Sequence, residues 1–194
     1  MTKWEFIEGQ LIASSIQGAL GRGCVYVPVA PEDRLQAQSD PRRRALRDQI
    51  GVRLRALRAQ YESQVSNEEH QANIFKLSED LTLEFGGTGL LRENRFRIGT
   101  AQKLLNLYLK YMWCLERVAT PPHCPFDSQI IARLHLTERR KQELQWTKVD
   151  SLSDYQSLVD AANMLIEGTH YASLAEWELD VWGSDSMLAD EFSA

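Results

Sequence analysis

Apolar residues recur at helical spacing along most of the chain, and alternating patterns are scarce. Residues 4–20 show this helical pattern, which ends at Gly21-Arg22-Gly23, where glycine favours a helix C-terminus. Residues 30–40 are predicted to form an exposed loop, and a second helix begins at Asp40-Pro41. Its apolar stripe consists of Leu46, Ile50, Leu54 and Leu57. At most a minor β segment is expected, near 24–29.

Further helices are marked by start and stop signals. Ser66 and Glu69 form a capping-box pattern at the start of a helical stretch that the glycine cluster 86–89 ends. Shorter helical patterns cover 127–134, 136–146, 150–166 and 173–183. We therefore expect a mainly α, compact fold of six to eight helices. It forms a single domain over residues 1–194, with any helical subdivision near 86–92.

Residues 100–115 combine an almost wholly apolar helix with one polar side. The polar side chains that share this side are Gln102, Lys103, Asn106 and Lys110. We expect the helix to be buried around most of its circumference, with Lys103 in a narrow polar seam in the first turn. Desolvation and the helix dipole then both favour a neutral amine, which is the nucleophilic form. The alternative is that Lys103 and Lys110 extend their amines to water.

A rigid turn follows this helix and leads to a single aspartate. Pro121, Pro122 and Pro125 restrict the turn, and Asp127 stands at the start of the next predicted helix. An aspartate at such an N-cap stabilises its helix by about 0.5 to 2 kcal/mol, which is the purely structural interpretation. The same N-cap hydrogen bonds would keep the Asp127 carboxylate ionised and hold it in one orientation. If the turn folds back on the preceding helix, we expect Asp127 to lie near Lys103.

Composition describes an ordinary globular protein. Hydrophobic residues make up 43% and charged residues 25%, and the apolar runs are too short to cross a bilayer. The first ten residues lack the basic and apolar regions of a signal peptide, so we expect a cytoplasmic protein without a membrane partner. Three widely spaced cysteines match neither a disulfide framework nor an iron–sulfur or zinc site. We therefore expect no metal and no cofactor.

The charge is unevenly distributed along the chain. The net charge of −5 argues against nonspecific coating of nucleic acid. However, residues 42–58 are rich in arginine with a single aspartate, and a smaller basic cluster spans 92–103, whereas the chain from 174 onward is acidic. The two basic segments are either solvated helix faces or two parts of one surface that contacts a phosphate backbone. Residues 42–58 also suit an amphipathic helix that binds a protein partner.

The region from 92 to 134 resembles the helix-hairpin-helix superfamily of base-excision DNA glycosylases, of the 8-oxoguanine-glycosylase type. The resemblance lies in a glycine-containing hairpin at "RIGTAQK", a lysine-bearing apolar helix, and then Pro-x-Asp before a further helix. The hairpin here has one glycine, Gly99, where the family usually has two. The resemblance implies a helix-hairpin-helix-like element, and a Lys/Asp mechanism on double-stranded DNA with a flipped base.

That resemblance assigns a role to each residue of a site. Lys103 would attack the sugar C1′ and form an imine, and Asp127 would support departure of the base. The backbone amides of Gly99 and Thr100 would bind a DNA phosphate, with Arg95 and Arg97 nearby. A flipped base needs an aromatic and polar pocket, for which Asn106, Tyr108 and His123 are the candidates. An alternative for His123 is a turn residue that hydrogen-bonds to backbone.

The sequence thus predicts a DNA glycosylase, with or without lyase activity, that excises a damaged or modified base. An oxidised purine and a hypermodified cytosine of phage DNA both fit this description. The alternative is a noncatalytic α-helical module that binds a protein partner in prokaryotic DNA processing or phage defence. Five tryptophans and an acidic, aromatic C-terminal segment suit such a partner surface.

Overall fold

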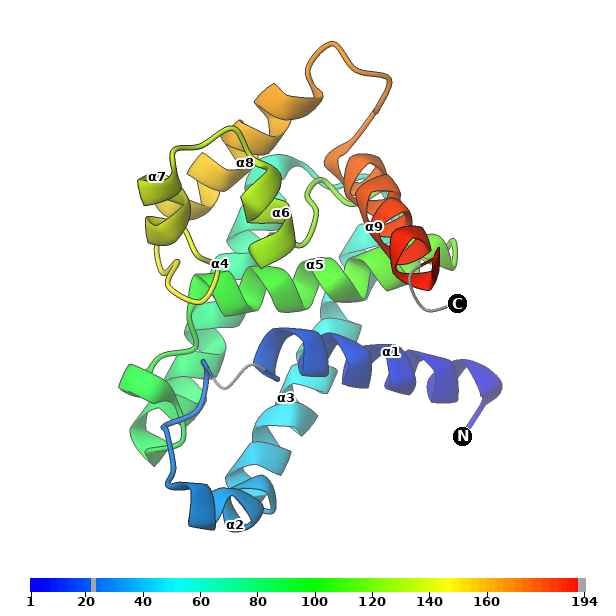
Figure 1. Ribbon diagram of the computed structural model, residues 1–194. Helices are drawn as coiled ribbons and strands as arrows, with labels where there is room; N and C mark the ends of the chain where they lie inside the picture. The colour runs from blue at the N-terminus through cyan, green and yellow to red at the C-terminus, as the bar shows by residue number, and fades with distance from the viewer. Residues whose placement is uncertain (22–23, 192–194) are drawn as a thin grey trace.

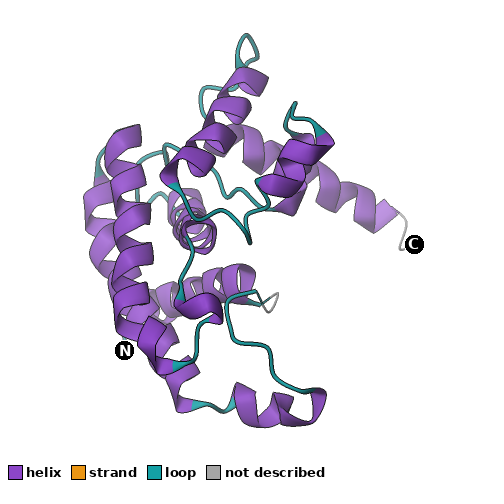
Figure 2. Cartoon of the chain, turned by 90° about the vertical axis from the view of Figure 1, so that its left-hand side faces the viewer, coloured by secondary structure: helices purple, strands orange, loops and turns teal. Residues whose placement is uncertain are grey.

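The computed structural model describes the backbone of residues 1–21 and 24–191, and side chains within these ranges as far as 183. Its described part contains nine α-helices. They are α1 (Lys3–Leu20), α2 (Arg34–Gln38), α3 (Pro41–Arg58), α4 (Asn67–Phe85), α5 (Ile98–Cys114), α6 (Ser128–Arg133), α7 (Glu138–Glu143), α8 (Leu152–Ile166) and α9 (Leu174–Glu191). The mainly α fold is confirmed, as Figure 2 shows. The expected number of helices was too low, partly because residues 30–40, predicted as a loop, contain the short helix α2.

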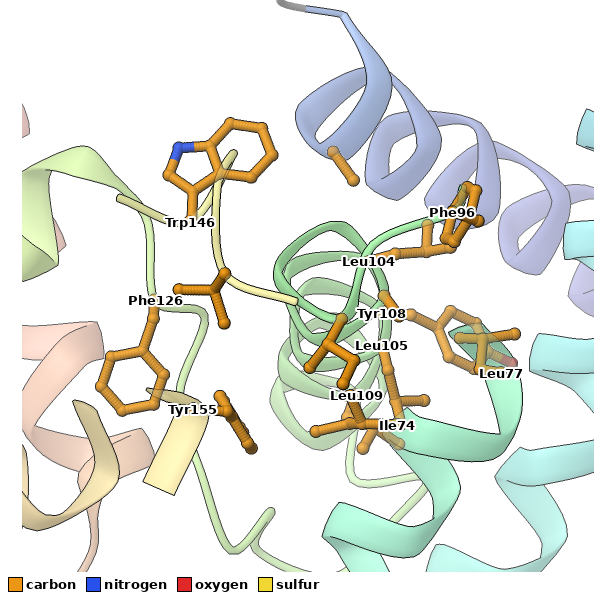
Figure 3. Packing of buried hydrophobic residues seen from close by; sticks show 14 of the residues in the cluster. Ile74, Leu77, Phe96, Leu104, Leu105, Tyr108, Leu109, Phe126, Trp146 and Tyr155 are labelled. Carbon is orange, nitrogen blue, oxygen red and sulfur yellow. The ribbon is translucent and has the colours of Figure 1, made fainter. Parts of the chain in front are cut away.

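Helix α5 crosses the middle of the molecule (Figure 1). It packs against α1 along much of its length and also contacts α3, α4 and α8. Its buried apolar residues include Leu104, Leu105, Leu109 and Met112. Figure 3 shows Trp146, Phe126 and Tyr155 on one side of this helix and Leu77 and Phe96 on the other. Because it is covered from several directions, α5 forms the centre of the hydrophobic core, as its apolar pattern predicts.

Several predicted helix starts are confirmed by their caps. The Asp40 side chain accepts a hydrogen bond from the Arg42 amide, and Ser66 and Ser151 accept from amides one turn into α4 and α8. Each such bond satisfies a backbone donor that the helix leaves unpaired. At the end of α1, Gly21 is the C-cap, whereas residues 22–23 lie outside the described part of the chain.

The connection between α4 and α5 differs from the predicted hairpin. Residues 86–97 hold two short 3₁₀ turns, Gly86–Thr88 and Arg92–Asn94, and left-handed backbone at Gly89, Glu93 and Asn94. The β-like run forms one isolated bridge, Tyr26 with Leu91, which ties it to this connection. The helix-hairpin-helix element is therefore not confirmed.

Gly99 allows a close approach that positions the site. Its amide donates a hydrogen bond of 2.8 Å to the Val149 carbonyl, so the segment 146–149 lies directly against the first turn of α5. A β-carbon at Gly99 would stand 1.8 Å from the Trp146 carbonyl oxygen. Because that oxygen belongs to the backbone, the segment would have to move to admit any side chain.

Among the described helices, none has the combination of length and apolar character that spanning a membrane requires.

Replacing Gly99 by alanine is therefore expected to destabilise the protein by about 3 kcal/mol, through displacement of the 146–149 segment. Gly9→Ala is the matched control, because nothing lies within 4 Å of a β-carbon added at this position of α1. The control should raise the free energy of unfolding by about 0.5 to 1 kcal/mol. Urea denaturation measures both values, and a Gly99→Ala protein as stable as the parent would show that this contact does not constrain the fold.

Candidate active site

Lys103 and Asp127 lie together in the interior. The Lys103 Nζ is 3.6 Å from Asp127 Oδ2, and the two side chains are 6% and 17% exposed. Lys103 is the sixth residue of α5, so it occupies the second turn and not the first turn that the sequence predicts. Asp127 is the N-cap of α6, as predicted, and its Oδ1 accepts hydrogen bonds from the amides of Gln129 and Ile130. The cap bonds hold one carboxylate oxygen and turn the other toward the lysine.

The polar side of α5 fixes the position of the turn that carries Asp127. The Gln102 side chain donates to the Phe126 carbonyl (2.8 Å) and accepts from the Phe126 amide (3.1 Å). One turn along the helix, the side-chain nitrogen of Asn106 donates to the backbone carbonyl of Cys124 at 3.0 Å. Buried polar backbone groups need such partners. The polar seam therefore binds the main chain of 124–126 and sets the distance between Asp127 and Lys103.

Trp146 covers the lysine from another side. Its ring centroid lies 4.4 Å from Lys103 Nζ, a cation–π geometry, and the indole is 1% exposed. The indole nitrogen donates to Ser128 at the start of α6. Lys110, further along the same side of α5, pairs with the buried Glu178 at 2.7 Å. Both lysines thus engage carboxylates in the interior, and the alternative in which they extend to water is wrong.

Two buried histidines extend the polar seam into a chain of hydrogen bonds. The Tyr61 hydroxyl bonds to His70 Nδ1 (2.7 Å), and His70 Nε2 bonds to the side-chain oxygen of Asn106 (2.9 Å). The side-chain nitrogen of Asn106 donates to the Tyr155 hydroxyl (3.3 Å). Tyr155 in turn bonds to His123 Nδ1 at 2.8 Å. The rings of His70 and His123 meet edge to face, with centroids 4.8 Å apart.

The direction of each bond in this chain follows from the donors available. Because Asn73 donates to the Tyr61 hydroxyl, Tyr61 donates its own proton to His70 Nδ1. His70 then carries its proton on Nε2 and donates to Asn106. Tyr155 accepts from Asn106 and donates to His123, whose proton is therefore on Nε2. That atom is buried without a hydrogen-bond partner among the described residues.

Burial keeps both histidines neutral at neutral pH. It lowers the pKa of His70 to about 3, with the neighbouring His123 adding to the effect, and it lowers the pKa of His123 to about 4. Burial also raises the pKa of Tyr155 well above its ordinary value. The hydrogen bonds from Tyr61 to His123 thus connect neutral groups, which lie beside the charged Lys103–Asp127 pair. His123 is part of this network, and within the described part of the chain its ring bonds to Tyr155 and not to backbone.

Tyr108 was predicted to line the base pocket but faces the opposite side of α5. Its hydroxyl donates to Glu8 of α1 at 2.9 Å, and burial raises its pKa, as does this carboxylate. Glu8 also pairs with Arg55 and Arg58 of α3. Tyr108 therefore joins three helices in the core, and the sequence pattern could not show which side of a mostly apolar helix it occupies.

The predicted phosphate contacts already have partners within the chain. Arg95 pairs with Glu79 and Asp150, and Arg97 pairs with Glu93 and donates to the Thr147 carbonyl. The amides of Gly99 and Thr100 donate to the carbonyls of Val149 and Arg97. In this conformation these groups hold the start of α5 against 147–150. They do not present donors to a phosphate.

Sequence reasoning assigned no role in the site to four residues that build it, Gln102, His70, Tyr155 and Trp146. Gln102 lies one turn from Asn106 on the polar seam, and that spacing was the available signal that both hold the turn. His70, Tyr155 and Trp146 come from distant segments and left no local signal.

No family model, curated protein or solved structure matches the chain. Within the described residues, no three His, Cys, Asp or Glu side chains are grouped closely enough to hold a metal ion.

Because the folded protein keeps these histidines neutral, its free energy of unfolding should depend on pH. An unfolded histidine binds a proton near pH 6.5, whereas the folded His123 does so only near 4, so the unfolded state binds more protons in between. The free energy of unfolding should therefore fall as pH is lowered from 6.5 toward 4. The maximal slope is about 1.4 kcal/mol per pH unit for each such histidine.

Urea denaturation between pH 7 and 5 tests this, because most carboxylates stay ionised there. His123→Gln should reduce the slope of unfolding free energy against pH by the contribution of one proton, about 1.4 kcal/mol per pH unit. His135→Gln, at an exposed position, should leave this slope unchanged. Equal slopes for the parent and the His123→Gln protein would mean that His123 is not held neutral by the fold.

Proposed function

We propose that this protein is a DNA glycosylase with AP lyase activity, in which Lys103 is the nucleophile and Asp127 the supporting carboxylate. The observation that carries the proposal is the 3.6 Å separation of Lys103 Nζ and Asp127 Oδ2 at positions that Trp146 covers. The pair stands on two helices, α5 and α6, and the two-point bond between Gln102 and Phe126 holds them in register. Such preorganisation is what nucleophilic catalysis requires.

The ion pair with Asp127 stabilises the charged amine in the resting protein, so the proposed reaction begins when the lysine gives one proton to solvent. The neutral nitrogen then bonds to C1′ as the glycosidic bond breaks, and the base leaves with the bonding electrons and takes up a proton from solvent. As the sugar ring opens, one proton moves from this nitrogen to the ring oxygen, which gives a protonated imine. Loss of a C2′ proton to solvent then forms the C2′–C3′ double bond and expels the 3′ phosphate. Asp127, fixed by its cap bonds, stabilises the positive charge that develops on the sugar.

Access to the amine requires a movement of the chain. Lys103 is 5% exposed, and Trp146 lies on it. The segment 146–149 contacts the first turn of α5 through the Gly99 hydrogen bond, so a flipped nucleotide reaches Lys103 only when this segment moves away. Trp146 would then offer an aromatic face for the extruded base to stack on. Asn106 and His123 act behind this surface, as supports of the 124–127 turn.

The burial of the pair also favours a second candidate. A lysine this deeply placed, with a carboxylate and an indole as partners, is equally a structural ion pair. The chain would then be a noncatalytic α-helical module that binds a protein partner. The exposed Trp182 and Leu179 of α9 would be part of its contact surface.

Borohydride trapping separates the two candidates. Duplexes that contain an abasic site, 8-oxoguanine or 5-hydroxymethylcytosine are incubated with the protein and borohydride, which reduces an imine to a stable amine. The parent protein should form a covalent complex that Lys103→Met abolishes. Lys76→Met is the matched control, since this lysine of α4 is 72% exposed and pairs with Asp80 one turn along the helix. Asp127→Asn should slow base release by about 100-fold.

Release of free base is measured alongside, because a monofunctional glycosylase forms no imine. Thermal unfolding of each variant shows whether it is folded. If folded parent protein yields neither a trapped complex, nor a nicked strand, nor a released base from any of the duplexes, the glycosylase proposal fails and the binding module is favoured.

A further inference from the structure

A cavity of about 930 Å³ lies between the C-terminal end of α1, the loop 26–29, α2 and the first half of α3. Its basic side chains are Arg34 of α2 and Arg43 and Arg47 of α3, which stand one turn apart on the same helix. Apolar side chains, among them Leu20 and Val29, form the rest of the wall. No acidic side chain of the described residues lines the cavity. The site is therefore electropositive and concave.

These three arginines differ from the others around them. Between residues 42 and 58, the remaining arginines all pair with carboxylates: Arg42 with Asp40, Arg44 with Asp48, Arg53 with Glu84, Arg55 with Glu8, and Arg58 with Glu8 and Glu62. Arg34, Arg43 and Arg47 have no carboxylate partner within the described part of the chain. Guanidinium groups gathered without an internal anion are suited to an external one.

A buried tyrosine adds an independent indication. Tyr26 lines the cavity, is 7% exposed, and its hydroxyl proton has no acceptor among the described residues. The Arg43 guanidinium lies over its ring at 4.1 Å from the centroid. Burial raises the pKa of Tyr26, whereas the nearby Arg47 guanidinium, through its charge and as a donor to the hydroxyl oxygen, and the Arg43 charge oppose this shift. A buried donor without an acceptor costs free energy, and a bound anion would supply the acceptor.

We propose that this cavity binds a phosphate group through Arg34, Arg43 and Arg47, with the Tyr26 hydroxyl as an additional donor. Planar guanidinium groups match phosphate oxygens in geometry and charge, and the apolar wall accommodates the carbon skeleton that carries the phosphate. The phosphate belongs either to a DNA backbone or to a free nucleotide or polyphosphate. This proposal is independent of catalysis by Lys103, because it concerns binding alone.

The site is tested by measuring how the protein of residues 1–194 binds two probes, a fluorescent undamaged duplex and sodium pyrophosphate. Arg47→Gln should weaken binding of the true ligand about tenfold, and Tyr26→Phe should weaken it about threefold without changing net charge. Arg44→Gln is the matched control, because it removes the same charge from an 88% exposed position on α3 outside the cavity. The control should change affinity less than twofold.

The two arms identify the source of the phosphate. If DNA is the ligand, Arg47→Gln also lowers the slope of log affinity against log salt by about one, and pyrophosphate competes weakly. If a free nucleotide or polyphosphate is the ligand, the variants lose pyrophosphate binding and keep their affinity for the duplex. If neither probe distinguishes the Arg47→Gln and Tyr26→Phe proteins from Arg44→Gln, with all variants folded by thermal unfolding, the cavity is not a phosphate site. Neither probe offers Lys103 a base to release, so a failure of the lyase proposal leaves this result unaffected.

Discussion

The side-chain amide of Gln102 pairs with the main chain of Phe126 as one peptide group pairs with another, and the candidate site depends on this pairing. It joins α5 to a turn that has no regular secondary structure of its own, at donor–acceptor distances of 2.8 and 3.1 Å. Asp127 follows directly, so its carboxylate inherits the position of Phe126. Because Gln102 is fully buried, loss of either bond would leave a backbone group unsatisfied in the core, which costs about 1 to 3 kcal/mol. The geometry of Lys103 and Asp127 is therefore fixed by packing and hydrogen bonds, and does not depend only on their attraction.

Burial has opposite consequences for the two kinds of titratable group, histidine and lysine, that lie around the polar side of α5. The histidines avoid charge, and each makes a neutral hydrogen bond within a chain that runs from Tyr61 to His123. The lysines retain partners of opposite charge, since a buried ion without one is costly. Both arrangements restrict how α4, α5 and α8 can pack, because a change of register would break several polar contacts at once. The polar seam thus gives the core a defined arrangement as well as a reactive pair.

The sequence predicted the parts of this structure that depend on neighbouring residues. The apolar pattern of α5, the four polar positions on its side, and the N-cap at Asp127 are all local, and proline restriction made the return of the turn foreseeable. The covering by Trp146 and the bonds to His70 and Tyr155 arise from segments far away in the chain, which no periodicity connects. Tyr108 was misplaced because a helix that is apolar almost all round does not indicate which side faces which neighbour. Arg95 and Arg97 looked available because their partners Glu79, Asp150 and Glu93 lie on other turns or elements.

The central claim is that Lys103 and Asp127 act as one unit, and a double-mutant cycle on the free energy of unfolding measures this directly. Lys103→Met and Asp127→Asn are compared with the double variant in urea denaturation at neutral pH. Each single change leaves the other group in the interior without its counter-charge, so the double variant should be more stable than the sum of the two losses by about 1 kcal/mol or more. Losses that add to within about 0.5 kcal/mol would show that the two groups do not interact, and would contradict the account of the site.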